Sequence, residues 1–124
     1  LANGKDSLID RQDILGVVMK GVDQEYDWTF IKQHLVSGRI LNFQRKQEEL
    51  VLSKRMADQL NYQLNDTISV YYVKNQPVLR KYKVVGIYQT GLEEYDQKLV
   101  FCRLPEVQKM NDFGIKTKNR ERWS

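Results

Sequence analysis

The sequence predicts a mixed α+β domain, built on a mainly antiparallel sheet with two to three short helices. Its 124 residues suit one ordinary domain and are too few for two independent ones. Extended and amphipathic segments follow one another in the order β, α, β, α, β, β, β, α. No internal repeat or linker-like composition divides them, so we expect one domain whose later half is an antiparallel meander.

The first strand and helix are predicted from β-branched density and from capping. Residues 14–22 (ILGVVMKGV) have the composition of a strand. Asp27 is a good N-cap for a helix at 28–35 (WTFIKQHL), whose apolar residues recur at helical spacing. Gly38 is expected to lie near the end of this helix.

The second strand leads directly into the second helix. Residues 49–53 (ELVLS) predict a short strand, and its last residue, Ser53, can cap a helix at 54–62 (KRMADQLNY). Residues 39–43 (RILNF) predict only a brief extended stretch before this pair. Strand and capped helix together resemble part of an α/β unit.

The next three strands are separated by turn residues. Asn65-Asp66 predicts a turn before an alternating strand at 67–73. Residues 79–101 predict two strands joined as a hairpin at 91–96. Gly86, inside the first of these strands, is typical of a bulge or a close backbone approach.

The last predicted element is a short helix. Pro105 suits the first turn of a helix at 105–113, which Gly114 would end. We therefore expect three parts: a polar N-terminal segment (1–13), an α+β domain (14–114), and a basic tail that is disordered or extraneous to the domain (115–124). The polar start lacks the pattern of a signal peptide, and we expect the chain to come from the middle of a longer protein.

The net charge of +4 is a weak indication of nucleic-acid binding. The last ten residues carry four basic side chains against one acidic one, so they account for +3 of the total. A basic tail on a nearly neutral domain is most simply a solvated terminus. Tyr71, Tyr72, Tyr82 and Tyr88 could form a base-stacking platform, although aromatic residues on strands more often pack in a core.

Single cysteine and histidine residues give little support for catalysis. Cys102 lies in a predicted strand and is expected to be buried, because free cysteine usually behaves as a small hydrophobe. His34 has no partner at a recognisable spacing, so a general-base role is not favoured. Neither can complete a usual four-ligand zinc site.

The acidic turn could in principle bind a hard cation. Glu93, Glu94 and Asp96 supply oxygen ligands, but they lack the order of an EF-hand loop. The glycines form neither of the phosphate-binding motifs. We therefore predict no catalytic, cofactor-binding or metal-binding residues.

Four stretches, in order, resemble a known family: GVVMKGVDQEYDW, LVSGRIL, EELVLSKRMADQLNYQLNDTISVYYV and KYKVVGIYQTGLEEYDQKLVFCRLPEVQKM. They look like the periplasmic domain of FtsX/MacB-type ABC transporter permeases, and are closest to the lipoprotein-releasing LolC/LolE-type branch. The resemblance spans about residues 14–110. The positions that match the family motif are Gly21, Asp23, Gly38, Arg39, Asp66, Gly86, Gly91 and Asp96.

This resemblance implies the insertion subdomain of a MacB-like periplasmic domain, carried by a protein of the cytoplasmic (inner) membrane. It implies a non-catalytic domain that couples ATP-driven motion to lipoprotein release or a related export process. The implied partners are a cytoplasmic ABC ATPase subunit, a second permease copy or paralogue, and a lipoprotein or periplasmic carrier. Flanking transmembrane helices outside this chain would hold it at the membrane.

One departure from the family concerns the turn at residues 74–78 (KNQPV). The carrier-docking subunit of lipoprotein-release systems has a long hairpin extension there, and this turn is too short for such a hook. A hookless subunit or a related permease is therefore favoured. We expect partner contact at this turn, at Lys74, Asn75, Gln76, Pro77 and Val78.

Two other functions are kept as alternatives. One is a small β-rich nucleic-acid-binding module that uses the tyrosines and the basic tail. The other is a hydrolase built on His34 and the turn with Glu93 and Glu94.

Overall fold

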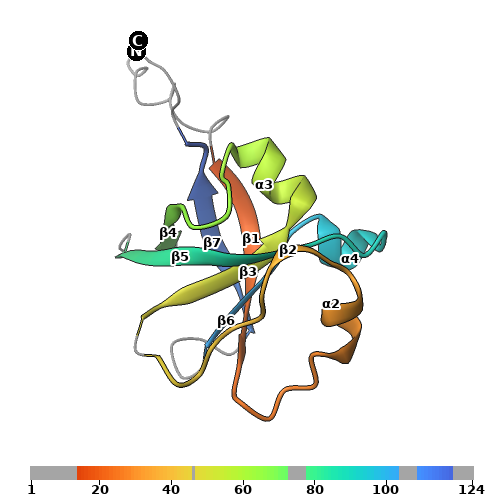
Figure 1. The fold of residues 1–124 in the computed structure, drawn as a ribbon. Helices are drawn as coiled ribbons and strands as arrows, with labels where there is room; N and C mark the ends of the chain where they lie inside the picture. The colour runs from red at the N-terminus through yellow and green to blue at the C-terminus, as the bar shows by residue number, and fades with distance from the viewer. Residues whose placement is uncertain (1–13, 46, 73–77, 104–108, 119–124) are drawn as a thin grey trace, which may run out of the picture.

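The computed structural model describes residues 14–45, 47–72, 78–103 and 109–118 (Figure 1). Seven strands and three helices are assigned in these ranges. The strands are β1 (Ile14–Val22), β2 (Leu35–Gly38), β3 (Glu49–Ser53), β4 (Thr67–Tyr72), β5 (Val78–Tyr88), β6 (Leu99–Arg103) and β7 (Lys109–Lys116). The helices are α2 (Thr29–Gln33), α3 (Lys54–Leu60) and α4 (Glu93–Asp96).

Six strands close into a β-barrel. The strands follow the order β5, β3, β6, β1, β7, β4, and β4 pairs again with β5. β2 is an extra strand, paired with β5 outside the barrel. The pairs β1–β6 and β3–β5 are parallel, and the other pairs are antiparallel. The predicted open, mainly antiparallel α+β sheet is therefore wrong, because the fold is mostly β and closed.

The length of β5 explains this closure. Its first half, residues 78–83, pairs with β4, and its second half, residues 83–88, pairs with β3. One strand thus belongs to both ends of the strand order and closes the barrel. The sequence pattern shows that this segment is extended, but it does not show which strands lie beside each half.

The predicted hairpin at residues 79–101 is also wrong. β5 and β6 do not pair, because β3 lies between them. The connecting segment, which contains α4, crosses over β3 instead of reversing the chain directly. The expected antiparallel meander fails for the same reason, since consecutive strands after β5 are not neighbours.

The predicted final helix is replaced by a strand. β7 covers Lys109–Lys116 and pairs with both β1 and β4, whereas residues 104–108 lie outside the described ranges. A central position in a barrel outweighs the weak local preference of this segment for a helix. β7 also continues past Gly114, where we expected the domain to end.

Several local predictions are confirmed. β1 and β3 have the predicted bounds, and Ser53 caps α3 by accepting a hydrogen bond from Met56 N. α2 is shorter than predicted, because residues 35–38 form β2 rather than the end of a helix.

Two apolar clusters lie on opposite faces of the barrel wall. The interior core fills the barrel, and α3 contributes Met56, Ala57 and Leu60 to it at one end (Figure 1). The outer cluster lies between the wall and the segments that carry α2 and α4, and it packs the aromatic rings of Trp28, Tyr88 and Phe101 against aliphatic side chains. β3 contributes Leu50 and Leu52 to the interior core and Val51 to the outer cluster, so these three residues are covered on both faces of the wall.

A bulge in β5 changes the face on which its side chains lie. The register with β3 passes from Val84 directly to Gly86, so Val85 is the extra residue, as the glycine predicted. Before the bulge Tyr82 and Val84 face the interior core; after it Ile87 faces inward. Tyr88 is therefore placed in the outer cluster.

Candidate functional site

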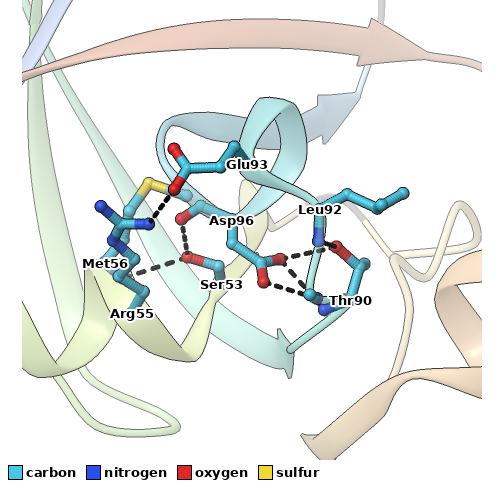
Figure 2. Close-up of polar contacts among 8 residues, drawn as sticks. Ser53, Arg55, Met56, Thr90, Leu92, Glu93 and Asp96 are labelled. Carbon is cyan, nitrogen blue, oxygen red and sulfur yellow. Dashed lines mark hydrogen bonds and ion pairs between the residues drawn. The ribbon is translucent and has the colours of Figure 1, made fainter.

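The acidic turn between β5 and β6 is organised by one buried carboxylate (Figure 2). Asp96 on α4 is only 8% exposed. Its Oδ1 accepts hydrogen bonds from Thr90 N at 3.0 Å and Thr90 Oγ1 at 2.8 Å. Its Oδ2 accepts one from Gly91 N at 2.8 Å, and Gly91 has a φ of 83°. Asp96 therefore fixes the backbone of the turn.

Ser53 connects this turn to α3. Its Oγ accepts a hydrogen bond from Met56 N at 3.0 Å and donates one to Asp96 O at 2.7 Å. A longer, exposed contact of 3.4 Å joins Arg55 Nη1 to Glu93 Oε2 (Figure 2). The capped end of α3 and the acidic turn thus form one network.

The three acidic residues of the turn do not converge on a common point. Asp96 is occupied by three donors, Glu93 lies beside Arg55, and Glu94 is exposed. Burial acts to raise the pKa of Asp96, but hydrogen bonds from Thr90 and Gly91 outweigh it and lower the pKa below its usual value. Within the described ranges, no group of three or more His, Cys, Asp or Glu side chains could hold a metal ion.

Two of the glycines singled out by the sequence resemblance, Gly38 and Gly86, allow β2 and β5 to approach closely. A Cβ on Gly86 would lie 2.1 Å from Arg39 O, and one on Gly38 would lie 2.1 Å from Val85 O. Arg39 N donates a hydrogen bond to Val85 O at 2.8 Å in the same place. Neither glycine leaves room for a side chain without moving the backbone.

Arg39 and Glu49 close the loop between β2 and β3. Arg39 Nη1 and Nη2 donate to the two carboxylate oxygens of Glu49 at 3.1 and 2.9 Å, and Asn42 N donates at 2.9 Å. Glu49 is 3% exposed. Burial acts to raise the pKa of Glu49, but Arg39 and Asn42 outweigh it and lower the pKa. Arg39 also lines an open depression of about 590 Å³ beside Gln24 and Asn42.

The turn before β4 is tied to β5. Asn65 has a φ of 75°, as its side chain permits. Asn65 N donates to Val84 O at 2.8 Å, and Val84 N donates to Asp66 O at 2.9 Å. Asp66 Oδ2 accepts from Gln63 N at 2.8 Å and from Lys118 Nζ at 3.0 Å. The two backbone bonds to Val84 connect this turn to β5, the strand that pairs with β4 where the barrel closes.

The remaining motif positions lie where β1 ends. Gly21 is opposite Cys102 in the parallel pair of β1 and β6. Asp23 Oδ1 accepts a hydrogen bond from Glu25 N at 2.9 Å in the turn that follows. Apart from Gly21, every motif position therefore lies at a turn or a close backbone approach, where its residue type controls the path of the chain.

The structure does not bring the candidate catalytic residues together. His34 Nδ1 donates to Phe30 O at 2.9 Å, and no hydrogen bond or ion pair joins His34 to Glu93 or Glu94. Cys102 is fully buried in the interior core, as predicted.

The tyrosines do not form one exposed platform. Tyr82 is 3% exposed and Tyr88 is fully buried. The Tyr88 hydroxyl lies within hydrogen-bonding distance of the carbonyl oxygens of Tyr95 and Leu99, and burial raises its pKa. Neither ring can stack on a nucleic-acid base.

The predicted partner-contact turn lies mainly outside the described ranges. Residues 74–77 are not described, and Val78 is the first residue of β5. Sequence reasoning named Arg39 only as a motif position and missed its ion pair with Glu49, in which the Glu49 side chain is 3% exposed and that of Arg39 is 43% exposed. The only signal was an acidic residue directly before an apolar run, which is too common to indicate burial.

No protein-family model matches the sequence, and the comparison with curated proteins finds no match either.

Proposed function

We propose that this chain is the non-catalytic extracytoplasmic domain of an ABC transporter permease, and that it couples ATP-driven motion to lipoprotein release or a related export process. The proposal rests on the sequence resemblance to the FtsX/MacB-type family together with the geometry of the barrel. The partners in it are a cytoplasmic ATPase subunit and a second permease subunit. The exported substrate or its carrier would contact the domain on the outer side of the membrane.

The observation that carries the proposal is the pairing of the first and last described strands. Ile14, where β1 begins, lies opposite Lys116, where β7 ends. A domain with this arrangement can be inserted between two neighbouring segments of another structure without separating them. Movement of either flanking segment would reach the barrel directly through β1 and β7.

The positions of the motif residues agree with a mechanical role. Gly38 and Gly86 let backbone segments approach closely, and Asp66 and Asp96 hold turns in place through hydrogen bonds to backbone N–H groups. In a closed barrel every strand is paired on both sides, so there is no unpaired edge strand. Such a barrel can move as one unit when a flanking segment moves. The described part of the chain contains no helix long and apolar enough to cross a membrane.

A labelling experiment on the native gene product tests the location. Val36 is 50% exposed, so Val36→Cys introduces an accessible thiol, whereas Cys102 is buried and serves as an internal control. We expect the protein in the membrane fraction, with position 36 labelled by a membrane-impermeant maleimide in spheroplasts. Cys102 should react only after denaturation. Recovery in the cytosol, or protection of position 36 until the membrane is broken, would refute the proposal.

A replacement experiment tests the coupling role. Because Ile14 and Lys116 are paired, a short Gly/Ser linker can replace residues 14–116 and keep the spacing of the flanking segments. We expect the shortened protein to insert in the membrane and its complex to hydrolyse ATP, while export stops. Unchanged export would contradict the proposal.

A further inference from the structure

A groove runs between α4 and the outer faces of β1 and β6. It has a volume of about 570 Å³, which is within the range of small-molecule sites. In β1, Val17 and Met19 face the interior core, so Val18 and Lys20 face outward. Val18 lies beside Leu99 of β6 in the parallel register, and these two side chains form an apolar floor.

Both signs of charge line this floor. Lys20 and Lys98 contribute two cations, and Glu93 and Glu94 contribute two carboxylates. Glu93 lies 3.4 Å from Arg55, which does not line the groove. Lys20, Lys98 and Glu94 form no ion pair with any residue in the described ranges. Cations and a carboxylate thus line one cavity without neutralising one another.

The walls of the groove are held in place by buried contacts. Val18 N donates a hydrogen bond to Lys98 O at 2.8 Å, which positions Lys98 beside β1. α4 is held from below by Asp96 and its three donors. Lys20 Nζ lies 5.6 Å from the centre of the Tyr26 ring, which restrains this side chain near the groove. The backbone that forms the groove is therefore already ordered before a ligand binds.

We propose that this groove binds a short zwitterionic peptide with an apolar side chain. The ligand's ammonium group would lie at Glu94, its carboxylate at Lys20 and Lys98, and its apolar side chain on Val18 and Leu99. A ligand with both charges is favoured because the groove offers partners for both. The inference depends on this groove alone and holds whether or not the domain belongs to a permease.

In the test, the tripeptide Ala-Leu-Ala with free ends is titrated into the full chain. Binding is monitored through the NMR chemical shifts of the backbone amides. We expect saturable shifts at Val18, Lys98, Leu99 and α4, with a dissociation constant on the order of 1 mM. N-acetylation and C-amidation of the peptide should each weaken binding roughly two- to fivefold, as expected for exposed ion pairs. The peptide with both ends blocked should bind most weakly.

Charge-removing variants assign each end of the peptide. Glu94→Gln should weaken binding of the peptide with free ends. In this variant N-acetylation of the peptide should no longer reduce affinity, whereas C-amidation should still reduce it. The double variant Lys20→Gln/Lys98→Gln should also weaken binding of the free peptide. In this variant C-amidation should no longer reduce affinity, whereas N-acetylation should still reduce it. Lys32→Gln removes an exposed lysine outside the groove and should change nothing. The proposal is overturned if the free peptide causes no saturable shifts, if blocked and free peptides bind equally, or if Lys32→Gln has the same effect as the groove variants.

Discussion

The interior core and the outer cluster are held together by different interactions. The interior core is almost entirely aliphatic, and every strand of the barrel contributes side chains to it, whereas β2 contributes none. The outer cluster combines aromatic rings, such as the Trp28–Phe101 pair with centroids 5.2 Å apart, with buried polar groups around it. The three buried polar or charged side chains of the described ranges, Glu49, Ser53 and Asp96, all lie outside the interior core.

This difference shows where specific bonding matters in the molecule. An aliphatic interior tolerates exchange among residues of similar volume, because its stability comes from burial. The outer layer depends on particular donors and acceptors, and a buried carboxylate that loses them is costly. We therefore expect substitutions to affect overall stability most in the interior, and sensitivity to acid most in the outer layer.

The largest effect should come from a cavity in the interior core. Leu52 is fully buried, so Leu52→Ala should lower the free energy of unfolding by about 2–5 kcal/mol. Val36→Ala, at a position that is 50% exposed, should change it by less than about 0.5 kcal/mol. Urea unfolding followed by circular dichroism measures both. Equal effects of the two substitutions would contradict the assignment of Leu52 to the interior.

A second effect should come from the contact between β2 and β5. A Cβ at Gly86 would lie 2.1 Å from Arg39 O, so Gly86→Ala forces the strands apart and should cost about 1–3 kcal/mol. Gly16 is the matched control, because nothing lies within 4 Å of a Cβ there. Thermal unfolding should show a lower melting temperature for Gly86→Ala only. In Gly86→Ala, amide hydrogen exchange should increase most at β2 relative to the wild type. Unchanged protection of β2 in this variant would contradict the prediction.

A third effect concerns the acidic turn. Asp96→Asn keeps the size of the side chain but places an amide beside backbone N–H groups that need an acceptor. The loss should be about 1–3 kcal/mol, as for unsatisfied buried donors. Glu94→Gln, on the exposed side of the same helix, should be nearly neutral. If Asp96→Asn is also neutral in urea unfolding, then Asp96 does not organise the turn.

The smallest expected effect is the change in the free energy of unfolding with pH, which is slight near neutral pH and grows on acidification. The pKa values of Asp96 and Glu49 are lowered in the folded state, so both carboxylates bind fewer protons there than in the unfolded chain. Their contribution is present above their unfolded pKa values of about 4, and it is lost as the pH falls through their folded values.

Urea midpoints measured from pH 7 to pH 3 test this sign. The double variant Glu49→Gln/Asp96→Asn should be less stable at pH 7 and should lose less stability than the wild type on acidification. Leu52→Ala should lower stability without changing the slope. A double variant with the wild-type slope would show that other carboxylates cause the acid dependence.

Local elements of the fold were predictable because their signals lie within a few residues. The apolar run of β3 followed at once by the cap of Ser53 predicted both the strand and α3. Gly86 predicted the bulge in β5, because a glycine within a strand pattern usually marks a bulge or a close backbone approach. The segment that forms β7 was predicted wrongly, because its local preferences for helix and strand are similar and two neighbouring strands decided the outcome.

The candidate sites were less predictable than the elements. Asp96 was singled out only as a position that matches the sequence resemblance, and its bonds to Thr90 and Gly91 and its link to Ser53 were not expected. The charged groove could not be foreseen, because its residues come from β1 and from α4 and the segment that follows it, more than seventy positions apart. Such sites depend on strand order, which no local pattern encodes.

By itself, the sequence determined that β1, β3, β4, β5 and β6 are extended, and it determined the capped helix α3, the turn residues and the burial of Cys102. Alternation, capping and turn geometry act over short distances. Only the tertiary structure decided that β5 pairs with β4 and β3 and so closes a barrel, and that β3 lies between β5 and β6. Each strand could pair with several other strands, and the pairing that forms depends on the burial summed over the whole chain.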